Sequence, residues 1–280
     1  MKNVLLPTDF SENSWNAIKY ALDFHEKIEC NFFLLHVNRL SHAAISHAPY
    51  LPTQEVIEDV YTKPAKMQLD NMLKRIIGYK PQSKKHKFYT ISDYNFFVES
   101  IREHVEEKNI DLIVMGTKGA SGLRKVIVGS NAGDVITKVA CSTLVVPENA
   151  SFKKIEEIAF PTDFSLQYNI NTLEPILKIV QDNQAALRVV HISKRQTDLN
   201  RDQMQNKELL EDYFHANPHS FHFLTNKKVE KAVQCFVESR DVDMITMIGK
   251  NLNYFQQILF HSKVEEISYH INIPFLVLHN

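Results

Sequence analysis

Short apolar runs alternate along the chain with longer segments in which apolar residues recur every three or four positions. Runs of the first kind predict buried strands, and segments of the second kind predict amphipathic helices. In the first half the predicted strands are Asn3–Pro7, Phe32–Val37, Lys87–Ile91, Leu112–Met115 and Thr143–Val146. The predicted helices are Ser14–Glu26, Thr53–Ile77, Phe96–Glu107 and Asn131–Val139. Regular alternation of β and α predicts an α/β fold with a parallel sheet covered on both faces.

The pattern of the first half is repeated in the second half. The sequence PTDFS begins at Pro7 and again 154 residues later at Pro161, each time after a short apolar segment. Further along, Asp111 in IDLIVMGTKG aligns with Asp243 in VDMITMIGKN, an offset of 132 residues. The offset falls from 154 to 132, so the second copy is 22 residues shorter. Repetition at half the chain length indicates a duplicated domain rather than a solenoid. We therefore expect two domains of the same fold, at residues 1–149 and 150–280.

Glycine is concentrated in one loop. Five of the seven glycines lie between Gly116 and Gly133, after the apolar run IDLIVM and before a helical segment. A strand, a glycine loop and a helix N-terminus together can hold a phosphate through backbone N–H groups. The spacing gives neither the G-x-x-x-x-G-K-[ST] loop nor the G-x-G-x-x-G fingerprint. The loop predicts a nucleotide site of another kind.

The spacing present is Gly116-x2-Gly119-x9-Gly129-Ser130. It resembles the ATP-binding motif G-x2-G-x9-G-[ST] of the universal stress protein family. The opening VLLPTDF, with Asp9 at a strand end, and the LLHV around His36 are similar to that family too. The resemblance implies a tandem member with a Rossmann-like sheet of five parallel strands in each half, in the order 3-2-1-4-5. Ligands of such sheets bind at the carboxyl ends of the strands, where the winding reverses.

The resemblance also implies the site. Asp9 would bind the adenosine part of ATP, and backbone near Val37 would read the adenine edge. The ribose and the first phosphate would lie against Gly116, and the remaining phosphates would lie on the loop and the helix start. The implied nucleotide-binding residues are Pro7, Thr8, Asp9, Val37, Met115, Gly116, Gly119, Gly129, Ser130 and Asn131. The implied cofactor is ATP, and any Mg or Mn would be held mainly by its phosphates.

Two of these residues have alternative roles. Asp9 can cap the following helix or form an Asx turn, and PTDF persists in the second copy, which favours a structural share. Asn131 can bind phosphate or belong to a helix cap. In the second copy the glycine positions hold Ile248, Asn251 and His261, so that half is expected to serve as structure, as a partner surface or as a site for another ligand.

Composition excludes several classes. A formal net charge of −1 argues against a general nucleic-acid binder, and no apolar run reaches the ~20 residues that span a bilayer. Cys30, Cys141 and Cys235 are scattered, which indicates neither a disulfide framework nor a zinc site and favours the cytoplasm. Thirteen histidines suggest a metal, but the turn NPHS interrupts the only close group, so no metal site is expected.

The leading hypothesis is a cytoplasmic ATP-binding regulator or sensor of the stress response. A slow ATP hydrolase or nucleotidyl-transfer enzyme is the alternative, without assigned catalytic residues, and a pure interaction protein suits the second half better than the first. We expect the two halves to pair through their edge strands Thr143–Val146 and Phe275–Leu278 as an intramolecular pseudo-dimer. A homodimer of the chain and an unidentified protein partner stay open.

Overall fold

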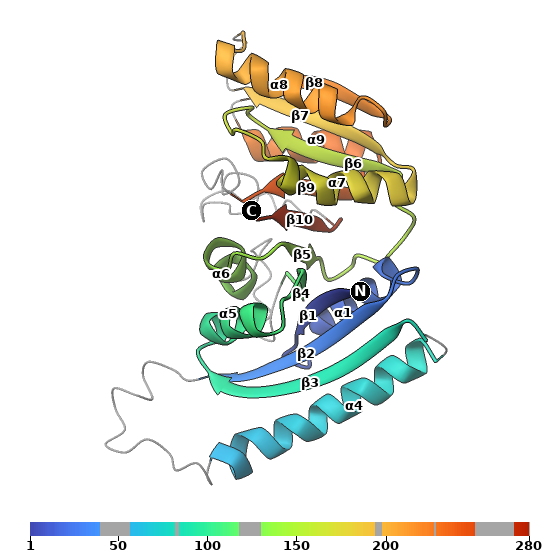
Figure 1. Cartoon of the computed structure of the whole chain (residues 1–280), viewed down its shortest axis with the longest axis vertical. Helices are drawn as coiled ribbons and strands as arrows, with labels where there is room; N and C mark the ends of the chain where they lie inside the picture. Colours follow the sequence, from blue (N-terminus) through green and yellow to red (C-terminus); the bar gives the residue numbers. More distant parts are fainter. Residues whose placement is uncertain are drawn as a thin grey trace, which may run out of the picture. The chain divides into compact units, whose positions relative to one another are not determined.

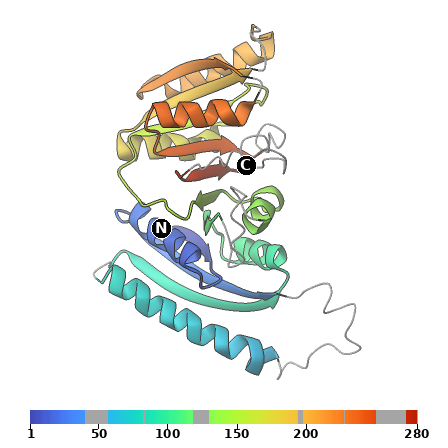
Figure 2. The same ribbon diagram turned by 180° about the vertical axis from the view of Figure 1, so that it is seen from behind.

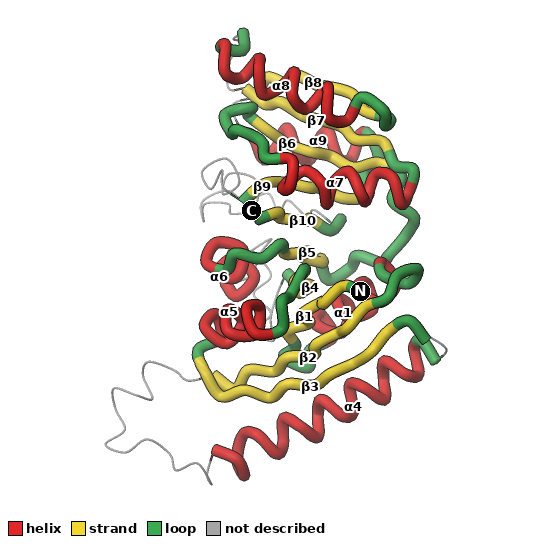
Figure 3. Tube along the Cα trace, in the orientation of Figure 1, coloured by secondary structure: helices red, strands yellow, loops and turns green. Residues whose placement is uncertain are grey.

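The computed structural model describes residues 1–39, 57–81, 84–117, 130–193, 198–226, 228–249 and 272–279. The chain divides into two compact units. Unit 1 comprises residues 1–122 and 129–152, and unit 2 comprises residues 123–128 and 153–280. Strands and helices alternate in both units (Figure 1, Figure 3).

Unit 1 is built on five parallel strands in the spatial order β3-β2-β1-β4-β5. These strands are β1 (Lys2–Pro7), β2 (Cys30–Arg39), β3 (His86–Asn95), β4 (Leu112–Gly116) and β5 (Thr143–Val146). Its described helices are α1 (Glu12–Phe24), α4 (Lys63–Tyr79), α5 (Phe97–Glu107) and α6 (Ser130–Lys138), with a π-helical turn η1 (Glu58–Thr62) before α4. The predicted strand order is confirmed.

The helices of unit 1 cover its sheet on two sides, as right-handed crossovers require. On one side α1 and α4 are joined by Arg75, which donates to both carboxylate oxygens of Glu12. On the other side α5 contacts α6. Figure 1 is viewed from the side of α5 and α6, and Figure 2 from the side of α1. The core between these layers is apolar and includes the fully buried Phe32, Leu5 and Ile18.

Unit 2 repeats this topology, with parallel strands in the order β8-β7-β6-β9-β10. Its strands are β6 (Glu157–Thr162), β7 (Ala186–Ser193), β8 (His219–Thr225), β9 (Met244–Ile248) and β10 (Phe275–Leu278). Its described helices are α7 (Ile170–Asn183), α8 (Arg201–Phe214) and α9 (Val229–Ser239). One aspartate has the same role in each unit. The Asp111 carboxylate accepts from the backbone N–H of Asn3, and the Asp243 carboxylate accepts from the backbone N–H of Glu157. Each aspartate therefore ties the start of the fourth strand to the first strand.

Most boundaries differ from the predicted ones by one or two residues, and the differences are largest for β3 and the long helix. Strand β3 continues to Asn95, because its pairing with β2 extends from Cys30 opposite His86 to Arg39 opposite Asn95 although the apolar pattern stops at Ile91. The long predicted helix is divided, and its residues 53–56 lie outside the described residues. Pro64 lacks an amide hydrogen, and its ring would clash with the carbonyl four residues earlier, which explains the wider π-helical turn before α4. None of the helices in the described ranges is both long and apolar enough to cross a membrane.

A buried histidine makes the stability of unit 1 depend on pH. His25 ends α1, is 1% exposed, and its Nδ1 lies 2.9 Å from the carbonyl oxygen of Ala21. Burial lowers the pKa of His25 from 6.5 to about 4, against a smaller opposing effect of that hydrogen bond. The unfolded chain therefore binds a proton below about pH 6.5 that the folded unit accepts only near pH 4.

We expect unit 1 to lose up to about 3 kcal/mol of stability through His25 as the pH falls from 6.5 to 4. The single tryptophan, Trp15, is buried in α1, so its fluorescence in urea reports the unfolding of this unit. His25→Gln should flatten the pH dependence in that window, whereas His215→Gln, at an exposed position, should leave it unchanged. Equal slopes for His25→Gln and the wild type would contradict this assignment.

Candidate functional site

The sheet of unit 1 opens at the carboxyl end of β1. Pairing of β1 with β2 continues to Pro7 opposite Leu35, but pairing with β4 stops at Leu5 opposite Ile113. The amide of Thr8 donates to Leu35, so the preceding nitrogen, that of Pro7, points toward β4. Proline has no amide hydrogen to donate there. The ladder to β4 therefore ends early, at the point where the strand order reverses.

A tight turn follows β1. The Thr8 hydroxyl accepts from the amide of Phe10 at 3.0 Å, and the Asp9 Oδ1 accepts from the amide of Ser11 at 3.1 Å. Phe10 has a φ of 63°, a left-handed conformation that is uncommon for a residue with a bulky side chain. The Asx turn that the sequence left open for Asp9 is present. The Asp9 side chain is exposed, so its predicted contact with adenosine stays a prediction.

His36 stabilises this turn from β2. Its Nδ1 lies 2.8 Å from the carbonyl oxygen of Thr8, and its ring stacks on Phe10 with 4.4 Å between ring centres. His36 is thus a packed, hydrogen-bonded histidine. The structural role of Phe10 was missed from sequence, although its repetition in both copies of PTDFS was a signal. The stack compensates for the left-handed backbone and fixes the turn.

Val37 presents backbone groups at the switch point. In a parallel strand the N–H and C=O of alternate residues face the same neighbour, and the carbonyl of Leu35 faces β1. The N–H and C=O of Val37 therefore face the same side, beyond the last residue of β1 that pairs with β2. Backbone groups in that position can read the donor and acceptor edge of a flat base. The predicted contact of Val37 with adenine stays a prediction.

Gly116 ends β4 beside the first turn of α1. A Cβ atom at this position would lie 3.1 Å from the Asn13 carbonyl oxygen and 3.4 Å from its carbon. Both are backbone atoms, which cannot swing aside as the end of a side chain can. A side chain here would therefore crowd the protein's own helix, besides any ligand. The preceding residue, Met115, is buried, 6% exposed.

The remaining predicted ligands lie at the start of α6. This helix begins at Ser130, which is exposed, and Asn131 is half-buried in its first turn. Ala132, Val135 and Ile136 are buried and fix the helix on the sheet. Gly119 and Gly129 lie outside the described residues, as does the rest of the loop from 118 to 129. The structure thus brings together one end of the predicted site, at β1, β2 and β4.

A family model matches the first half of the chain. The model of the universal stress protein family matches residues 1–147, which is more than half of the 280-residue chain. The chain belongs to the universal stress protein family.

Individual relatives agree with the family assignment. A universal stress protein of Methanocaldococcus jannaschii is 28% identical over 145 residues, which cover 52% of this chain and 81% of the relative. A second one from that organism is 26% identical over 164 residues, covering 54% of this chain and 97% of the relative. The crystal structure of a universal stress protein from Archaeoglobus fulgidus superposes with a TM-score of 0.72 at 20% identity. This likeness covers 98% of this chain and 97% of the other, so the fold of both units is shared.

Unit 2 keeps the turn of this universal stress protein fold but changes its surroundings. The Thr162 hydroxyl accepts from the amide of Phe164, whose φ is 55°, and Phe164 stacks on His191. From α8, Asn206 Nδ2 donates to the carbonyl of Phe164 at 2.8 Å, and Gln203 Nε2 donates to that of Asp163 at 2.8 Å. Phe164 is fully buried, whereas Phe10 in unit 1 is half-buried.

The helix that follows the turn begins later in unit 2. Ile248 replaces Gly116, and α7 begins only at Ile170, whereas α1 begins at Glu12, one residue after PTDFS. Tyr168 takes the place of Ser14, and its hydroxyl bonds that of Thr162 as Ser14 bonds Thr8. Tyr168 is buried, 8% exposed, as is Ile248.

The described residues contain no group of three or more His, Cys, Asp or Glu side chains that could hold a metal ion. The three closely spaced histidines of unit 2 have separate partners. His215 pairs with the carbonyl of Asp212, His219 with that of Asn217, and His222 with the hydroxyl of Ser220.

Gly116→Ile, which places the unit 2 residue in unit 1, should destabilise unit 1 by about 1–3 kcal/mol, because the side chain displaces the first turn of α1. Urea unfolding followed through Trp15 measures the effect. Gly78→Ala is the matched control: its Cβ meets nothing within 4 Å, and alanine in a helix should be neutral or stabilising by up to ~1 kcal/mol. Wild-type stability of Gly116→Ile would show that Gly116 is not needed for packing.

Proposed function

We propose that this universal stress protein is an ATP-binding regulator or sensor whose nucleotide lies at the switch point of unit 1. Asp9 and the backbone of Val37 bind the adenosine, and the ribose lies against Met115 and Gly116. The phosphates lie on the loop that contains Gly119 and Gly129, and on Ser130 and Asn131 at the start of α6. The observation that supports this most is the backbone of Val37, which faces the switch point beyond the pairing of β1 with β2.

The start of α6 supports the position of the phosphates. The first N–H groups of a helix have no partner within the helix, and the helix dipole favours an anion there. Ser130 adds a hydroxyl at an exposed position. We expect Mg or Mn, where one accompanies the nucleotide, to be held by the phosphates.

Binding is a better account than turnover. Asp134 is the first acidic residue after the glycine loop, and it forms an ion pair with Lys138 at 2.7 Å within α6. The segment from Gly116 to Asn131 itself contains no acidic residue that could act as a general base. A slow ATP hydrolase stays the alternative.

The setting of this function is also a prediction. We place the protein in the cytoplasm, where the buried thiols Cys30 and Cys141 would stay reduced. Burial raises the pKa of Cys30 to about 11, so this thiol is unreactive near neutral pH. Pairing of the two units through β5 and β10, a homodimer of the chain and a protein partner that receives the signal all stay proposals.

The proposal gives one ATP for each chain. In unit 2 the residue opposite Gly116 is Ile248, which is 8% exposed, and the turn after β6 is covered by Asn206 and Gln203. Gly249 is displaced by one residue from the position of Gly116 and lies beside the His279 ring, 2.8 Å from where its Cβ would be.

Titration calorimetry of the full chain with ATP should give a stoichiometry near one. Gly129→Val should weaken binding roughly a thousandfold or more, because it would remove about three hydrogen bonds to charged phosphate, each contributing ~1.5–3 kcal/mol. The control Gly78→Ala, in α4, should bind like the wild type. Two equal sites, or unchanged affinity in Gly129→Val, would contradict the proposed site.

A further inference from the structure

The short helix α6 is held at its far end by an arginine of the neighbouring helix α5. Arg102 donates to the carbonyl oxygen of Lys138 twice, from Nε at 2.9 Å and from Nη2 at 2.7 Å. Lys138 is the last residue of α6, whose first residue is Ser130. The third nitrogen of the guanidinium, Nη1, donates to the Oε1 of Glu99 at 2.8 Å. Glu99 thereby fixes the plane of the guanidinium.

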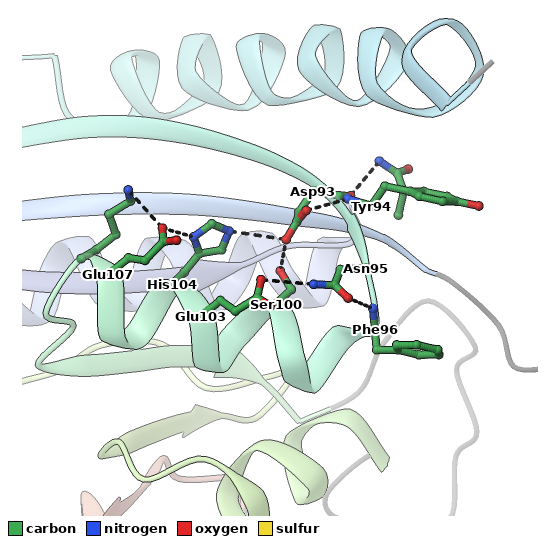
Figure 4. A network of polar contacts seen from close by, with 10 residues as sticks. Asp93, Tyr94, Asn95, Phe96, Ser100, Glu103, His104 and Glu107 are labelled. Carbon is green, nitrogen blue, oxygen red and sulfur yellow. Dashed lines mark hydrogen bonds and ion pairs between the residues drawn. The ribbon is translucent and has the colours of Figure 1, made fainter. Parts of the chain in front are cut away.

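The face of α5 opposite to Arg102 is bonded to the end of β3. The hydroxyl of Ser100, which is fully buried, donates to the Asp93 Oδ2 at 2.6 Å. His104 lies one turn further, with its Nε2 3.5 Å from the same carboxylate (Figure 4). Ser100 and His104 share one face of α5, and Arg102 lies on the other. The helix is therefore a fixed support between the sheet and α6.

The ion pair between Arg102 and Glu99 has little effect on stability. The side chains of Arg102 and Glu99 are 46% and 52% exposed, and an exposed ion pair contributes little to folding. Its effect is on the orientation of α6. Helix α6 has nine residues and is about 13 Å long, so fixing its last carbonyl also fixes where its first N–H groups point.

We propose that Arg102 is a positioning residue for the phosphates of the bound nucleotide, acting through α6. The guanidinium holds the C-terminal end of α6, and the N-terminal end at Ser130 then stays in register with the phosphates. This inference rests on the proposed function, since it assumes that a nucleotide binds there. It adds that a residue outside the glycine motif, on another helix, sets the affinity for the phosphate part alone.

The test is titration calorimetry of the full chain with ATP, ADP, AMP and adenosine. Arg102→Ala should weaken ATP binding by roughly tenfold, the size of one lost phosphate contact, and should leave adenosine binding unchanged. The loss of affinity in Arg102→Ala should be largest for ATP, smaller for ADP and smallest for AMP. Arg102→Lys keeps the charge but not the two hydrogen bonds to one carbonyl, so its affinity for ATP should lie between those of Arg102→Ala and the wild type. Unfolding followed through Trp15 should be nearly the same for all variants.

Two further variants separate positioning from long-range charge. Glu99→Gln removes a negative charge, so a purely electrostatic effect would strengthen ATP binding, whereas loss of orientation weakens it. Lys80→Ala removes the same charge as Arg102→Ala, but Lys80 pairs with Asp23 and Glu26 near the amino ends of the strands. We expect weaker ATP binding in Glu99→Gln and no change in Lys80→Ala.

The outcomes distinguish this inference from the proposed function. Wild-type affinities in both Arg102→Ala and Glu99→Gln, with ATP binding intact, would overturn the positioning role alone. Equal losses for ATP and adenosine would overturn it too, since that result indicates general damage to unit 1. Absence of ATP binding by the wild type would remove the proposed function, and the inference with it.

Discussion

The ladder of hydrogen bonds along β1 ends at different residues on its two sides, and the site depends on this difference. Toward β2 the pairing reaches Pro7, and toward β4 it stops at Leu5. Proline at the end of the strand removes the donor that would continue the second ladder. The backbone of Val37 in β2 faces the switch point because β1 pairs with β2 only as far as Pro7, and Thr8 begins the turn that leads into α1. The proposed place of the nucleotide follows from where these two ladders end.

The two units make a natural comparison of this arrangement. Both have proline at the strand end, the same left-handed phenylalanine and a histidine stacked on it. These features therefore belong to the fold rather than to a ligand. One difference at the site is Gly116 in unit 1 and Ile248 in unit 2, which accompanies the later start of α7 and the burial of Tyr168.

Much of the fold could be predicted from the sequence, because strands that are buried on both faces are apolar throughout. The bounds of β5 and β10 were predicted to the residue. Strand β3 was predicted too short, because beyond Ile91 it continues through polar residues that pair by backbone alone. The strand order came from the family resemblance, since apolar patterns carry no information on which strands are neighbours.

The site was harder to predict than the fold. The spacing of the glycines indicates a phosphate loop, but the packing reason for Gly116 depends on Asn13, more than a hundred residues away in sequence. The contact of Arg102 with the last carbonyl of α6 has no sequence motif, because a backbone oxygen of any residue serves as the acceptor. Long-range contacts of this kind become visible only in the folded unit.

The central claim is that nucleotide binds at the switch point of unit 1 and at no equivalent place in unit 2. Amide hydrogen exchange of the full chain, with and without ATP, tests it most directly. The account predicts slower exchange on adding ATP in the peptides that contain Val37 and Ser130 to Ala132, and unchanged exchange in those that contain Ile192 and Ile248. Equal slowing in both units, or no slowing at Val37, would contradict it.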